Sequence, residues 1–182
     1  MKSLLFLLIF VALGISCNTN SEAPVATGLA PDSSTVEPAY PYTLESPYRE
    51  WQAGDRQHVV TVMKSLKAFE AGDMDGCMTA FGDTVDLRFD GYYAKLAKDS
   101  AKKMLTQSRQ ALAAVKINMA DWESVISKDK KHEYVTLWYK EIQTDRKGKV
   151  DSLSIVDDIK IVNGKIVEID QKIQHFPPAQ KM

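Results

Sequence analysis

Apolar positions in the first half of the folded region recur at helical spacing. From residue 58 onward they fall three or four residues apart, at Val59, Val62, Met63, Leu66 and Phe69. This spacing places them on one face of an amphipathic helix, which Gly72 should end. Residues 74–81, MDGCMTAF, predict a short second helix, and residues 98–115 show a helical pattern again.

The chain between and after these helices alternates apolar with polar residues, as half-buried strands do. Val85, Leu87 and Phe89 lie on one face of a first strand, and Asp90-Gly91 predicts a hairpin to a second strand around residues 92–96. Turn sequences then separate four longer strands, predicted over residues 115–127, 133–144, 151–162 and 165–175.

The short turns between these four strands predict an antiparallel meander. Between Met119 and Trp122 the parity of the apolar positions changes, which predicts a β-bulge that bends the sheet. Helices followed by a bent antiparallel sheet indicate an α+β domain.

This order of elements, with the stretches LKAFEAGDMDGCMTAF, VDLRFDG, YVTLWYKE and IVDDIKIVNGKIVEID, resembles the SnoaL-like branch of the nuclear transport factor 2-like superfamily. The resemblance covers residues 55–176. It implies a cystatin-like cone, in which a strongly curved antiparallel sheet wraps around about three N-terminal helices and encloses a pocket. The superfamily includes isomerases, cyclases, dehydratases and catalytically silent binding domains, so the fold does not identify the function.

Two adjacent aspartates, Asp157 and Asp158, interrupt the third of the four long strands. Asp157 shares its parity with Leu153, Ile155, Ile159 and Ile161, so it should point into the cone, whereas Asp158 should face solvent. A carboxyl group among apolar side chains has a raised pKa, which suits a general base. The alternative is an inward aspartate at the open mouth, hydrogen-bonded to water or a backbone amide.

Tyr139 is the candidate partner of Asp157, because it shares a face with Val135 and Leu137 and could donate from its hydroxyl group. If the sheet twists locally, Trp138 would take its place. The predicted catalytic pair is therefore Asp157 and Tyr139, and the predicted ligand pocket comprises Asp157, Tyr139, Trp138, Ile155 and Ile159. Members of the superfamily often have a His-Asp pair here, but Val156 occupies the position expected for the histidine.

The first residues have the layout of a secretory signal peptide. Lys2 precedes an apolar run over residues 4–13, and small residues follow before Cys17. The run Gly14-Ile15-Ser16-Cys17 resembles the lipobox of bacterial lipoproteins, which implies that Cys17 is acylated and anchors the protein to a membrane. The alternative is an ordinary signal peptide with an incidental Cys17.

The chain is thus expected to have three parts. Residues 1–16 form a lipoprotein signal peptide, residues 17–47 form a lipidated cysteine and a disordered linker rich in Pro, Ser, Thr and Ala, and residues 48–178 form the domain. We expect the domain to lie in the bacterial cell envelope, outside the cytoplasm and on the periplasmic side.

Charge and motif content exclude several functions. The chain carries 23 basic and 24 acidic residues, a net charge of −1, which lacks the basic excess of nucleic-acid-binding proteins. The three histidines do not have metal-ligand spacing, and no phosphate-binding glycine loop or Cys-x-x-Cys pair is present. We expect neither a metal nor an organic cofactor.

Three functional hypotheses remain. The missing His-Asp pair favours non-catalytic binding of a small, partly apolar ligand or a protein partner. The alternative is an enzyme like SnoaL or ketosteroid isomerase, with Asp157 as general base and Tyr139 as polarising donor. A third possibility is a homodimer that packs through an apolar sheet face formed by Trp122, Tyr134, Trp138 and Ile142.

Overall fold

The computed structural model describes residues 39–176, and the folded domain belongs to the compact unit Leu44–Met182. Its helices are α1 (Arg56–Ala71), α2 (Met74–Met78) and α3 (Lys98–Gln110). Its strands are β1 (Gln52–Ala53), β2 (Phe81–Phe89), β3 (Tyr92–Ala97), β4 (Leu112–Ile126), β5 (Glu133–Asp145), β6 (Val150–Val162) and β7 (Lys165–His175).

Local chemistry explains where these elements begin and end. The side chain of Asp55 accepts a hydrogen bond of 2.7 Å from the backbone amide of Gln57 and so caps α1. Gly72 ends that helix in the left-handed conformation, with φ of 82°. Asn163 and Gly164 both have positive φ in the two-residue turn between β6 and β7, as the Asn-Gly sequence predicts.

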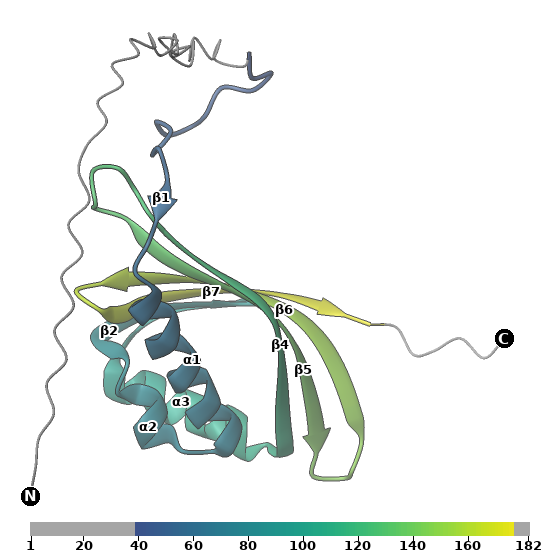
Figure 1. The fold of residues 1–182 in the computed structure, drawn as a ribbon. Helices are drawn as coiled ribbons and strands as arrows, with labels where there is room; N and C mark the ends of the chain where they lie inside the picture. Colours follow the sequence, from purple (N-terminus) through teal and green to yellow (C-terminus); the bar gives the residue numbers. More distant parts are fainter. Residues whose placement is uncertain (1–38, 177–182) are drawn as a thin grey trace, which may run out of the picture. The chain divides into compact units, whose positions relative to one another are not determined.

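The strands form one curved sheet in the order β1-β4-β5-β6-β7-β2-β3. The meander of β4 to β7 is antiparallel, and the register shift between Met119 and Asp121 is the expected bulge. One pair, β2 with β7, is parallel, so the sheet is mixed. The α+β cone-like fold class is confirmed, and Figure 1 shows the three helices gathered on one side of the curved sheet.

The third helix is shorter than the pattern predicted. It ends at Gln110, and residues 112–115 already belong to β4, where Ala114 lies opposite Thr144 of β5. The alanines of this stretch favour a helix, but pairing with β5 overrides that preference.

The core lies between the inner face of the sheet and the helices. Val85 and Leu87 of β2 and Val135 and Leu137 of β5 are fully buried there, together with side chains such as Val62 from α1. Alternation along each strand sends every second residue to the outer face.

The predicted dimerisation face does not exist as one surface. Trp122 lies opposite Leu137 on the inner face, where the guanidinium of Arg56 lies over its ring. Tyr134, Trp138 and Ile142 have the opposite parity and lie on the outer face. The bulge after Met119 changes the parity, and it separates Trp122 from the other three.

Candidate functional site

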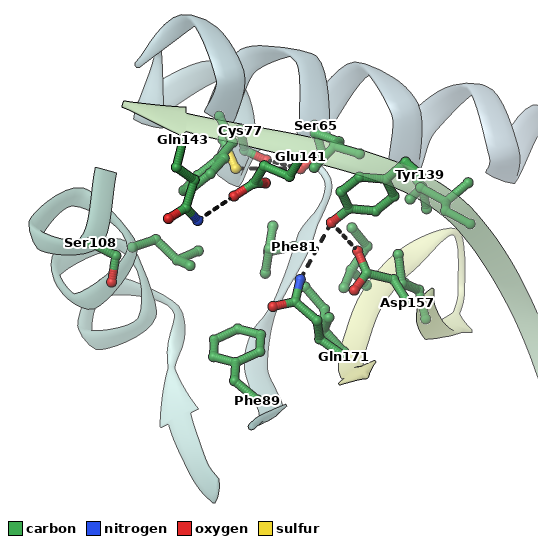
Figure 2. Close-up of a pocket in the computed structure, with 18 of the residues that line it drawn as sticks. Ser65, Cys77, Phe81, Phe89, Ser108, Tyr139, Glu141, Gln143, Asp157 and Gln171 are labelled. Atoms are coloured by element: carbon green, nitrogen blue, oxygen red, sulfur yellow. Dashed lines mark hydrogen bonds between the residues drawn. The ribbon is translucent and has the colours of Figure 1, made fainter. Parts of the chain in front are cut away.

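A cavity of about 370 Å³ lies between the inner face of the sheet and the helices. Residues of α1, α2 and α3 line one side, and residues of β2, β4, β5, β6 and β7 line the other. Most of its wall is aliphatic or aromatic, with Phe81 and Phe89 among the lining side chains shown in Figure 2. Small-molecule sites are typically such concave, mostly apolar spaces with a few polar groups.

Asp157 of β6 points inward, as its parity predicted. Its side chain is buried, with 4% of its surface exposed, and it lines the cavity. The hydroxyl group of Tyr139 donates a hydrogen bond of 2.8 Å to Oδ2 of Asp157. Oδ1 is buried as well and has no hydrogen-bond partner within residues 39–176. Asp158 lies on the outer face and accepts from Thr136 and Lys172.

This environment perturbs both members of the pair. Burial raises the pKa of Asp157 from 3.8 to about 6, and the hydroxyl of Tyr139 and the nearby side-chain amide of Gln171 partly oppose that rise. Burial, and then the adjacent Asp157, raise the pKa of Tyr139 well above its usual value of 10. At pH 7 Asp157 is therefore mainly a carboxylate, and Tyr139 is a neutral donor.

A second carboxyl group, Glu141 of β5, also lines the cavity. It is 6% exposed, and its Oε1 accepts a hydrogen bond of 2.6 Å from the side-chain amide of Gln143. Burial raises its pKa. Sequence reasoning missed both residues, although Glu141 and Gln143 continue the inward parity of Leu137 and Tyr139.

Other polar groups come from β7 and from the helices. Gln171 of β7 lies directly opposite Asp157 across the strand pair, and its amide donates to the hydroxyl of Tyr139 at 3.4 Å. On the helical side, the hydroxyl of Ser65 donates a 2.8 Å bond to the backbone carbonyl of Cys77. Cys77 is 3% exposed, as expected for a small core residue, and burial raises the pKa of its thiol.

Of the three other residues predicted to line the pocket, only one lies in the cavity wall. Ile159 lines the cavity. Ile155 points inward but is packed in the core, and it is not among the lining residues. The prediction that Trp138 lines the pocket is wrong. Leu137 pairs with Asp157 on the inner face, so Trp138 lies on the outer face beside Val156.

Cys17 and the predicted signal peptide lie outside the described residues, as does most of the predicted linker. In the part of the chain that the structure describes, no helix is both long and apolar enough to span a membrane. Within the same part, no group of three or more His, Cys, Asp or Glu side chains is placed to hold a metal ion.

No protein-family model matches the chain, and no curated protein matches it by sequence. Solved structures do match it. An NTF2-like protein of unknown function from Exiguobacterium sp. 255-15 is 18% identical with a TM-score of 0.52, over 63% of this chain and 98% of that one.

Two further structures match at a similar level. AusH from Aspergillus nidulans is 16% identical with a TM-score of 0.54, over 68% of this chain and 87% of its own. An LEH-like epoxide hydrolase from M. tuberculosis is 12% identical with a TM-score of 0.53, over 65% and 84%. These identities are low, so the matches carry information on the fold alone.

Proposed function

Given that the domain has the nuclear transport factor 2-like fold, we propose that it binds a small, largely apolar ligand in its internal cavity and holds one polar group of that ligand through Asp157. The observation that carries this proposal is Oδ1 of Asp157, a buried acceptor without a partner among residues 39–176, in the wall of a cavity of about 370 Å³. A buried polar atom without a hydrogen bond costs free energy, and a ligand donor would remove that cost.

Binding without catalysis is the better supported form of this proposal. A proton-transfer enzyme of the ketosteroid isomerase kind needs a base and, opposite it, a donor that polarises the substrate. Tyr139 is the expected donor, but its hydroxyl hydrogen is directed at Asp157 itself. The polar arrangement therefore offers the ligand an acceptor, whereas the donor is already used within the protein.

The second candidate is proton abstraction by Asp157. One observation favours it. Burial raises the pKa of Asp157 to about 6, and a general base is most efficient when its pKa lies near the pH of the reaction. The discriminating measurement is exchange of deuterium from heavy water into the C–H bonds of the bound ligand. Exchange with the wild type that disappears in Asp157→Asn, with binding kept, would establish catalysis. No exchange in either protein would support binding alone.

The cavity itself can be tested by closing its mouth. Ser108 lines the cavity and is exposed on α3, so Ser108→Trp should fill the entrance without disturbing the core. We expect this change to reduce the binding of the neutral apolar dye N-phenyl-1-naphthylamine at least tenfold in a fluorescence titration. Gln107→Trp is the matched control, because Gln107 is exposed on the same helix and does not line the cavity. Equal dye binding by both variants and the wild type would contradict the proposal.

The N-terminal sequence supports a proposal for the cellular location of the protein. We propose that the mature protein is a lipoprotein anchored through Cys17 in the bacterial cell envelope, with its domain outside the cytoplasm. The support is the lipobox-like run Gly14-Ile15-Ser16-Cys17 after a short apolar segment. A domain in that place would meet apolar molecules that cross or leave the membrane.

A further inference from the structure

The ionisable groups in the cavity wall are unevenly distributed. Two carboxyl groups line it, those of Asp157 and Glu141, and none of the lining residues is Lys, Arg or His. The two carboxyl groups lie on neighbouring strands, β6 and β5, and each is less than 7% exposed. Within residues 39–176, neither forms an ion pair.

One basic group, Arg109, acts on Glu141 but does not line the cavity. Burial raises the pKa of Glu141 and the guanidinium of Arg109 partly opposes that rise, but the nitrogens of Arg109 donate to the backbone carbonyls of Phe69, Glu70 and Leu112. Arg109 is not among the residues that line the cavity. The positive charge of Arg109 is therefore not exposed to the cavity, whose wall contains two carboxyl groups.

The free acceptor capacity of these groups is directed inward. Figure 2 shows the carboxyl group of Asp157 turned toward the interior of the pocket, with one oxygen occupied by Tyr139. The other oxygen, Oδ1, has no partner in the described part of the chain. Glu141 uses Oε1 for the amide of Gln143, and no hydrogen bond involves its Oε2 within residues 39–176. The cavity thus presents unpaired acceptors on acidic groups in an apolar setting.

From this arrangement we infer that the ligand is a cationic amphiphile, an apolar body that carries one protonated amine, which donates to Oδ1 of Asp157 and lies within the field of Glu141. This inference rests on the proposed function and names its ligand class. Opposite charges attract strongly where water is excluded, and a protonated amine supplies donors and no acceptor. An anionic ligand would bring a negative charge against the carboxylate of Asp157, beside a second carboxyl group and with no basic residue in the wall, so the site disfavours it.

The test uses three probes with one skeleton and different head groups: 2-naphthylmethylamine, 2-naphthylmethanol and 2-naphthoate. Each is titrated into the purified full chain at pH 8 by isothermal calorimetry. We expect the amine to bind at least tenfold more tightly than the alcohol, and the carboxylate to bind more weakly than both. Equal affinities, or a preference for the carboxylate, would overturn the cationic ligand and leave the binding cavity standing. Failure of all three probes to bind would overturn both proposals.

Variants test whether the two carboxyl groups cause the preference for the amine. Asp157→Asn should lower the affinity for the amine at least tenfold and change that for the alcohol less than threefold. Glu141→Gln should act in the same direction with a smaller effect. Asp83→Asn is the control, because it removes one negative charge from an exposed position outside the cavity. An amine preference that survives in both cavity variants would overturn the inference.

The pH dependence provides an independent measurement on the wild type. The other titratable groups that line the cavity are Glu141, Cys77 and Tyr139, and burial keeps the last two protonated up to pH 8 by raising their pKa. Lowering the pH from 8 to 5 therefore protonates Asp157, whose pKa is about 6, while the amine stays charged. The affinity for the amine should fall at least threefold and that for the alcohol should stay constant. A constant amine affinity over this range would contradict the role of the carboxylates.

Discussion

Replacing Asp157 with asparagine should stabilise the folded protein at alkaline pH, because the buried carboxylate opposes folding. Asp157 is 4% exposed, and its pKa rises from 3.8 to about 6 on folding. One pKa unit corresponds to about 1.4 kcal/mol, so the rise corresponds to about 3 kcal/mol of stability. The folded protein binds this proton more tightly than the unfolded chain. The stabilisation that comes from this tighter proton binding by Asp157 is therefore fully present below pH 3.8 and is lost as the pH rises through about 6.

The asparagine side chain keeps an oxygen that can accept from Tyr139 and carries no charge at any pH. In urea unfolding, the free energy of unfolding of Asp157→Asn should thus exceed that of the wild type by about 3 kcal/mol at pH 8 and by about 1 kcal/mol at pH 4.5. Asp83→Asn, at an exposed position, should match the wild type at both pH values. A gain that does not depend on pH, or a loss of stability at pH 8, would refute the argument that burial of the charge dominates.

Three further predictions concern other parts of the chain. Tyr139→Phe removes a hydrogen bond that lowers the pKa of Asp157, so a carbon-13 NMR titration should place that pKa above about 6, and an unchanged value would contradict the assignment. Leu87→Ala empties a fully buried position and should cost about 2–5 kcal/mol in urea unfolding, whereas a cost near zero would mean that this part of the core is not packed as described. Cys17→Ser should move the protein from the membrane fraction to the soluble fraction and abolish labelling with radioactive palmitate, and continued membrane retention would disprove the lipid anchor.

Much of the fold follows from local patterns in the sequence. The Asn163-Gly164 and Asp90-Gly91 turns set two hairpins, and alternation along β6 sends Asp157 inward and Asp158 outward. The parity change after Met119 marks a real bulge. These features depend on residues that are close in sequence, so a single sequence contains the information needed to predict them.

Features that depend on distant residues were missed. The parallel pairing of β2 with β7 joins segments about 80 residues apart, and no local signal identifies it. Gln171 was missed for a more local reason: the register of the β6–β7 hairpin shifts between Lys160 and Ile161, so that Gln171 rather than Asp170 lies opposite Asp157. The end of α3 was misplaced because β5 draws the alanine-rich stretch into the sheet.

Glu141 was a different kind of omission. Its inward position could have been predicted from the parity of Tyr139, two residues earlier on the same strand. Charged residues at strand positions are usually solvated, and that general tendency concealed it. The two buried carboxyl groups together are what define the chemistry of the cavity, so this omission mattered more for function than for fold.

The most direct test of the central claim is a crystal structure of the protein purified from the cells that produce it, with mass spectrometry of any molecule released from the same preparation. We predict electron density in the cavity, with a polar atom within hydrogen-bonding distance of Oδ1 of Asp157. A cavity filled by the protein's own side chains, with Oδ1 bonded to one of them, would contradict the claim that this domain binds a ligand inside its cone.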